Sequence, residues 1–154
     1  SLGSYSVAGS LFSNTCGSGI GAKNPWEFTA EMSRDGDTLY LDQSDGADDS
    51  QIVFGTVEPT EGKKATLTSI VTTNVDRDAN GAAGPCNLTL STTYDISLND
   101  ASAPRSFVST ATFDYAAATG VSSTTNCTDQ LASQGGKYAT LPCTVVYSLT
   151  GKRK

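Results

Sequence analysis

Hydrophobic and polar residues alternate along most of this 154-residue chain, and this period of two constrains its fold more than any other feature. Successive side chains of a β-strand point to opposite faces, so each alternating run predicts a strand with one buried side. The helical spacing i, i+3, i+4 is nowhere sustained. We therefore predict an all-β protein. The alternation predicts eight strands, at residues 5–11, 26–32, 38–41, 52–57, 65–75, 88–98, 107–117 and 144–151.

Most connections between these strands are short and rich in Gly, Asp, Asn or Pro, which favour tight turns. The clearest is the Asp35-Gly36 step, typical of a β-hairpin. Short connections join antiparallel neighbours, so we predict an up-and-down meander over residues 1–154, closed into a single-domain barrel that has no edge strands. A β-sandwich is the alternative, which the long fifth to seventh strands and the lack of a Cys…Trp…Cys spacing disfavour.

This architecture is similar to the meander barrels of the lipocalin and streptavidin group. The signatures of those families do not carry over, because no G-x-W motif lies near the first strand and a single tryptophan cannot form a multi-tryptophan biotin pocket. The similarity therefore implies a fold and does not imply a ligand.

The chain has four widely spaced cysteines, at positions 16, 86, 127 and 143. None belongs to a C-x-x-C pair, which excludes zinc ribbons and dithiol redox motifs. An even number at wide spacing predicts two structural disulfides and an oxidising compartment. Of the three pairings we favour Cys127–Cys143 with Cys16–Cys86, because the first closes the irregular segment 119–142 and the second ties two strand ends. A loop as short as the first would contribute about 3 kcal/mol.

Compartment and partners follow from the disulfides and the charge. No run approaches the ~18 apolar residues of a membrane helix. We therefore expect a mature secreted, periplasmic or cell-surface protein whose export signal or lipid-anchoring segment has been removed, with membrane contact only through such an anchor. The formal net charge of −6 repels polyanions, so we expect no nucleic-acid partner.

Several common chemistries are excluded. The chain has no histidine, which removes the usual general base of hydrolases and the usual nitrogen ligand of catalytic metals. Glu27 and Glu31 share a strand face but lie roughly 13 Å apart, beyond the ~5–9.5 Å of glycosidase carboxylates. The Gly-rich run 16–21 leads into a strand rather than a helix, so it does not match a phosphate-binding loop. We predict a non-enzymatic protein, with a hydrolase using carboxylates from different strands as the least favoured alternative.

One segment matches the opening of a calcium loop. In residues 76–81, Asp76, Asp78 and Asn80 place hard oxygen ligands at alternate positions before Gly81. The twelfth position is Asn87 rather than a bidentate Glu, and no helices flank the segment. A plain hairpin turn is therefore the alternative. We expect calcium as the one candidate cofactor.

Two further polar features have simple interpretations. Four acidic residues surround a Gly-containing turn, where they oppose edge-to-edge association: Asp42, Asp45, Asp48 and Asp49. Asn87-Leu88-Thr89 and Asn126-Cys127-Thr128 match the N-glycosylation pattern, which matters only in a eukaryotic secretory pathway. Residues 128–132 are expected to form one helical turn.

Aromatic residues are expected on the buried side of the strands, where an eight-stranded barrel is either filled by side chains or holds one small ligand. We predict a secreted or cell-envelope binding protein for a small apolar ligand. The alternative is a structural or adhesive module that binds another surface protein or copies of itself and is stabilised by calcium. The candidate ligand-binding or core residues are Trp26, Phe28, Tyr94, Phe113, Tyr115 and Tyr147, together with Phe107.

Overall fold

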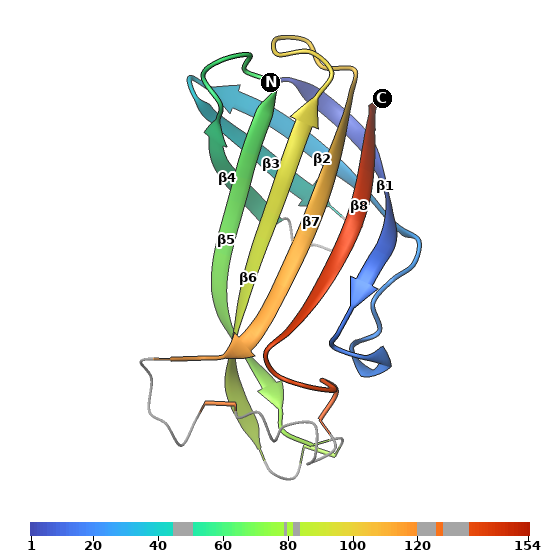
Figure 1. Cartoon of the computed structure of the whole chain (residues 1–154), viewed down its shortest axis with the longest axis vertical. Coiled ribbons are helices and arrows are strands. Elements are labelled where there is room, and N and C mark those ends of the chain that lie inside the picture. The colour runs from blue at the N-terminus through green and yellow to red at the C-terminus, as the bar shows by residue number, and fades with distance from the viewer. Residues whose placement is uncertain (45–50, 79, 82–83, 120–125, 128–135) are drawn as a thin grey trace.

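The computed structural model describes residues 1–44, 51–78, 80–81, 84–119, 126–127 and 136–154. Eight antiparallel strands form a meander that closes into a barrel (Figure 1), which confirms the predicted fold class. The elements are β1 (Gly3–Asn14), η1 (Ser18–Ile20, a 3-10 helix), β2 (Trp26–Asp35), β3 (Thr38–Ser44), β4 (Gln51–Val57), β5 (Lys64–Asp76), β6 (Pro85–Leu98), β7 (Ser106–Ala117) and β8 (Cys143–Arg153).

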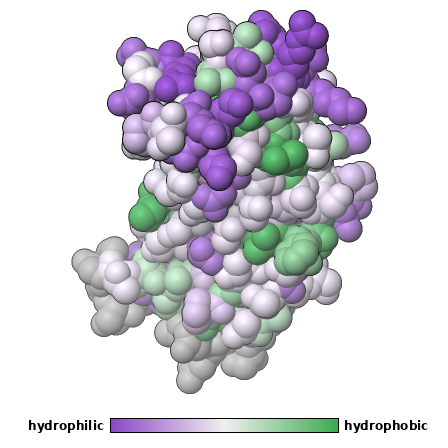
Figure 2. Space-filling view, turned by 45° about the horizontal axis from the view of Figure 1, so that its top comes forward, coloured by the Kyte–Doolittle hydropathy of each residue, from purple (hydrophilic) through white to green (hydrophobic). Residues whose placement is uncertain are grey.

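The two ends of the barrel differ. One end, which we call the terminal end, holds both termini and the connections β2–β3, β4–β5 and β6–β7 (Figure 1). The other end, which we call the mouth, is where β1, β3, β5 and β7 end and where residues 15–25 lie. Charged and other hydrophilic residues gather at the terminal end, as the upper part of Figure 2 shows. The basic residues Lys152, Arg153 and Lys154 are exposed there.

Alternate residues of each strand point inward and fill the terminal half of the barrel. The rings of Tyr5 and Phe107 meet edge to face at 5.4 Å, and the Tyr5 hydroxyl donates a hydrogen bond to the Pro104 carbonyl at 2.7 Å. Gly151 leaves the space that Phe107 occupies, because a Cβ at that position would lie 2.1 Å from the ring. The interior is therefore packed around Phe107 at this end.

The β4–β5 pairing is the shortest seam of the barrel. Only four pairs join these strands, from Phe54↔Thr68 to Val57↔Ala65, whereas thirteen join β5 to β6. Beyond Thr68, within the described part of the chain, β5 pairs with β6 alone. Val71, which is on the same side of β5 as the buried Leu67, is 48% exposed there, and the outward-facing Ile70 is 73% exposed. Gly55 lies in the middle of this seam.

The predicted disulfide pairing is wrong: the structure contains Cys16–Cys143 and Cys86–Cys127. Barrel closure explains the first, because β1 pairs with β8 and brings the end of β1 beside the start of β8. The second follows from the bridge between Asn87 and Asn126, which lays the segment containing Cys127 along β6. The two disulfides indicate an oxidising environment. Within the described residues, no helix has the length and hydrophobicity needed to cross a membrane.

Candidate ligand-binding site

Residues 15–25 leave β1 and lie across the mouth, fastened to the start of β8. The Cys16–Cys143 disulfide is the covalent link. Backbone hydrogen bonds reinforce it, from the Thr15 amide to the Thr144 carbonyl at 2.9 Å and from the Ala139 amide to the Cys16 carbonyl at 2.8 Å. Gly19 packs so closely that a Cβ would lie 2.4 Å from the Lys137 carbonyl oxygen. The segment is therefore held in a fixed position over the barrel.

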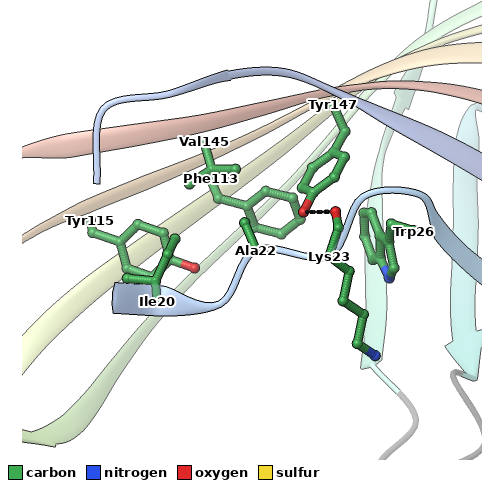
Figure 3. Close-up of a pocket in the computed structure, with 8 residues that line it drawn as sticks. All are labelled: Ile20, Ala22, Lys23, Trp26, Phe113, Tyr115, Val145 and Tyr147. Carbon is green, nitrogen blue, oxygen red and sulfur yellow. Dashed lines mark hydrogen bonds between the residues drawn. The ribbon is translucent and has the colours of Figure 1, made fainter. Parts of the chain in front are cut away.

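A cavity of about 180 Å³ lies beneath this segment, at the mouth (Figure 3). One wall comes from the inward face of three strands, because these positions continue the alternation that fills the core. The other wall comes from the segment between β1 and β2. The lining residues are Trp26 from β2, Phe113 and Tyr115 from β7, Val145 and Tyr147 from β8, and Ile20, Ala22 and Lys23 from the covering segment.

Three aromatic rings form one corner of the cavity. Trp26 contacts Tyr147 with ring centroids 5.0 Å apart and meets Phe113 edge to face at 5.7 Å. Phe113 and Tyr147 are also edge to face, at 6.2 Å. Aromatic pairs in such geometries contribute about 0.5–1.5 kcal/mol beyond their buried area. The three rings thus hold one another in place without a ligand. A further aromatic ring in the cavity would contact their faces and edges in the same way.

The two tyrosine hydroxyls of the cavity differ in their hydrogen bonding. Tyr147 donates to the Lys23 carbonyl at 2.7 Å, which ties the covering segment to β8. The hydroxyl of Tyr115 donates to no described residue. Burial raises the pKa of both side chains, and the neighbouring Tyr147 raises that of Tyr115 further. Both hydroxyls therefore stay protonated near neutral pH, and that of Tyr115 can serve a ligand.

The structure separates the predicted ligand residues into two groups. Four of them line the cavity: Trp26, Phe113, Tyr115 and Tyr147. Phe28 and Tyr94 lie deeper in the core, as does Phe107, and the Tyr94 hydroxyl accepts a hydrogen bond from the Gln43 amide. Sequence reasoning did not single out Val145, Ile20, Ala22 or Lys23 for the site. The alternation of β8 signalled Val145, whereas the other three lie in a connection with no periodic signal.

The predicted calcium residues lie in the tight β5–β6 turn at the mouth. Asp76 ends β5 and is exposed, Asp78 is half-buried and Asn80 is exposed. The Gly81 amide donates to the Asp78 carbonyl at 3.3 Å, and Gly81 has a φ of +68°. In the described ranges no three His, Cys, Asp or Glu side chains are grouped to hold a metal ion. Calcium binding at this turn stays a prediction.

Other predicted features lie elsewhere or outside the described residues. Asp42 is a half-buried residue of β3, while Asp45, Asp48, Asp49 and the predicted helical turn 128–132 lie outside the described ranges. The glycosylation candidate Asn87 is half-buried. Its side chain accepts a hydrogen bond from Asn74 at 2.9 Å and donates one to Asn126 at 3.4 Å. A glycan on Asn87 would break this row of amides.

Comparison of the chain with protein-family models, curated proteins and solved structures found no match. The geometry of the barrel and its cavity is therefore the basis for assigning a function.

Alkaline pH is expected to destabilise the protein through its buried tyrosines. Burial, and then the neighbouring Tyr115, raises the pKa of Tyr138 to about 12, and burial also raises the pKa of Tyr94. The native state holds these protons more tightly than the unfolded chain does. The contribution of these protonated tyrosines to the free energy of unfolding is therefore complete below pH ~10 and is lost as the pH rises toward 12. Urea unfolding between pH 8 and 11.5 measures this loss.

The variant Tyr138→Phe lacks one of these titrating groups, so its free energy of unfolding should fall less steeply above pH 10. Equal slopes for the variant and the wild type would contradict the assignment to Tyr138.

Proposed function

We propose that this chain is a non-enzymatic binding protein that holds a small apolar molecule in the mouth of its barrel. The observation that carries this proposal is the cavity of about 180 Å³, walled by aromatic side chains, which continues from the buried hydrophobic core of the barrel. Trp26, Phe113 and Tyr147 are already packed against one another, so a ligand meets a preformed site. Preformed, mostly apolar cavities with a few polar groups are typical of small-molecule sites.

The size of the cavity limits the ligand. Apolar cavities of roughly 150 Å³ admit benzene, whereas pockets for drug-sized molecules have about 300–1,000 Å³. This site therefore fits one ring with a short substituent, or one end of a longer molecule. Burying about 150 Å² of apolar ligand surface contributes about 4 kcal/mol, which corresponds to a Kd on the order of 1 mM.

Hydrolysis receives no support at this site. No carboxylate belongs to the described residues that line the cavity. The chain also has no histidine to act as a general base there. Binding without chemistry is the function that these side chains support.

The proposed location is outside the cytoplasm, as a secreted, periplasmic or cell-surface protein. The two disulfides support this placement, because such bonds persist in oxidising compartments. A removed lipid-anchoring segment is compatible with it and would provide the membrane contact. The net charge of −6 disfavours nucleic acid as a partner.

One observation favours a second candidate function, a structural module that assembles with copies of itself. Residues 69–76 of β5 pair only with β6 in the described part of the chain, and Ile70 beside that edge is exposed. Ser69 to Val75 is uncharged and lacks proline, so it has neither of these two common obstacles to strand pairing. A second copy could add its own β5 in antiparallel register.

Native mass spectrometry of the unreduced protein distinguishes these functions. An organic adduct of one-ring size, released by denaturant and kept in a chelator, supports the binding function. Bare monomer that gains no mass in 2 mM toluene contradicts it. Dimers and higher species that grow with concentration support self-assembly, and a chelator-sensitive calcium adduct adds metal to that module.

Removing the indole of Trp26 is expected to weaken binding of toluene at least tenfold, because the indole lines the cavity and also contacts the rings of Phe113 and Tyr147. Trp26 is the only tryptophan in the chain, so its emission spectrum reports occupancy of the wild-type cavity directly. For Trp26→Ala, the toluene-induced rise in Tm replaces fluorescence as the measurement.

The matched control is Phe12→Ala, which removes an aromatic ring that is 79% exposed on the outside of the barrel. Its toluene-induced rise in Tm should equal that of the wild type. If toluene raises the Tm of Trp26→Ala as much as it raises that of the wild type, toluene binds outside this cavity.

A further inference from the structure

Among the described residues, the cavity has one tyrosine hydroxyl that takes no part in holding the fold together. Tyr147 donates its proton to the Lys23 carbonyl at 2.7 Å, and this bond holds the covering segment. Tyr115 also lines the cavity, yet no described residue accepts a hydrogen bond from it. Figure 3 shows its hydroxyl beside Ile20, directed toward the side of the cavity where Ala22 and Phe113 lie. Since no described residue accepts from it, this donor is open to solvent or to a ligand.

The ring of Tyr115 is held in place independently of its hydroxyl. It packs on Tyr138 with centroids 5.3 Å apart, and Tyr138 is itself only 5% exposed. Its backbone pairs with Leu90 of β6 on one side and with the disulfide-bonded Cys143 of β8 on the other. The donor is therefore preorganised, and a ligand that uses it does not have to order it first.

Resting on the binding function proposed above, we infer that the cavity takes an uncharged single-ring aromatic molecule with a hydrogen-bond acceptor, and that the Tyr115 hydroxyl is the donor that selects it. An aromatic ring is favoured over an aliphatic one because Trp26, Phe113 and Tyr147 offer faces and edges for a further ring. The acceptor, such as a carbonyl oxygen, pairs with the donor that the protein leaves open. A ligand without an acceptor would displace water from Tyr115 and leave its hydroxyl unsatisfied.

Charged ligands are disfavoured for two reasons. Aromatic rings attract cations, but the described residues that line the cavity include no carboxylate to pair with one. Figure 3 shows the Lys23 side chain running beside Trp26 with its nitrogen directed away from Tyr115. An anionic group that accepts a hydrogen bond from Tyr115 would therefore not lie against the Lys23 ammonium. Removing that anion from water would cost free energy that no ion pair with Lys23 offsets.

The test compares two ligands of the same shape. Acetophenone and α-methylstyrene are isosteric, but only the ketone carries an acceptor. We measure both dissociation constants by saturation-transfer NMR for the intact disulfide-bonded wild type and for Tyr115→Phe. Because the two ligands have the same shape, the ratio of their dissociation constants does not depend on how well that shape fits the cavity. The difference in hydrophobicity between the ligands is the same for both proteins, so comparing the ratio between wild type and variant removes it. We expect the preference for the ketone to fall about fivefold in Tyr115→Phe, the typical net effect of one hydrogen bond.

The control is Tyr138→Phe, which removes a hydroxyl beside the cavity from a residue that does not line it. It should keep the wild-type preference for acetophenone. Benzoate and phenyltrimethylammonium should both bind more weakly than acetophenone, and tighter binding of either would overturn the requirement for an uncharged ligand.

The outcomes separate this inference from the function on which it rests. If neither acetophenone nor α-methylstyrene binds the wild type, the proposed binding function fails. If both bind, and Tyr115→Phe keeps the same preference as the wild type, the cavity is a binding site but Tyr115 does not select its ligand. A fivefold loss of the preference for acetophenone that occurs only in Tyr115→Phe supports both the binding function and the role of Tyr115.

Discussion

Replacing Cys16 and Cys143 together by serine is expected to lower the free energy of unfolding by about 5 kcal/mol and to abolish binding at the mouth. The stability loss is large because this bond joins residues 127 positions apart, so its removal returns the entropy of a long loop to the unfolded chain. The binding loss is expected because the same bond fastens the covering segment with Ile20, Ala22 and Lys23 to β8. Urea unfolding and toluene titration measure the two effects.

The second disulfide provides the matched control. Cys86–Cys127 spans 41 positions, and its removal should cost about 4 kcal/mol. Neither of its cysteines lines the cavity or belongs to the covering segment. The variant Cys86→Ser/Cys127→Ser should therefore still bind toluene at temperatures where it is folded. Equal binding losses in the two double variants would show that the Cys16–Cys143 bond has no specific role at the site.

The alternation of residue types was sufficient to predict the barrel. All eight predicted strands are present, because each buried face in this fold repeats with period two from Tyr5 to Leu149. The strands extend beyond the predicted runs, as in β1, which continues to Asn14. Backbone pairing with β8 does not require an apolar side chain, so polar residues such as Ser13 and Asn14 gave no signal.

The disulfide pairing could not be predicted in the same way. The preferred Cys127–Cys143 pairing joined neighbours along the chain, whereas the real partners become neighbours only when β1 meets β8. Barrel closure is a property of the whole sheet, and no local pattern near Cys16 encodes it. Cysteine number and spacing supported two disulfides, but they left the three pairings open.

The cavity was predictable only in part. The inward direction of Trp26, Phe113, Tyr115 and Tyr147 follows from alternation, but whether such residues fill a barrel or leave space depends on their partners across it. Phe107 fills the terminal half because Gly151 lies against its ring. At the mouth the opposing residues come from the connection 15–25, whose conformation depends on a disulfide and on contacts with residues 137–144.

The short β4–β5 seam makes Gly55 the position where one added methyl group has the largest expected effect on the sheet. A Cβ at Gly55 would lie 1.9 Å from the carbonyl oxygen of Thr66 and 2.8 Å from the Cα of Leu67. Both atoms belong to the backbone of the facing strand, so no change of rotamer can relieve the contact. The strands must separate where only four pairs hold them. We expect Gly55→Ala to lower the free energy of unfolding by about 3 kcal/mol or more.

The contrast with Gly9 makes this expectation specific to the seam. A Cβ at Gly9 would also be crowded, at 2.6 Å, but its neighbour is the Cδ2 atom at the end of the Leu149 side chain, which can rotate. Gly9→Ala makes the same chemical change at an inward-facing strand position, and we expect it to cost about 1 kcal/mol. Hydrogen exchange adds a local measurement, because the Glu58 amide donates to the Lys64 carbonyl across this seam and Gly55→Ala should expose it before the rest of the sheet opens. If both alanine variants lose the same stability and the Glu58 amide stays protected, the seam is not the point at which this barrel opens.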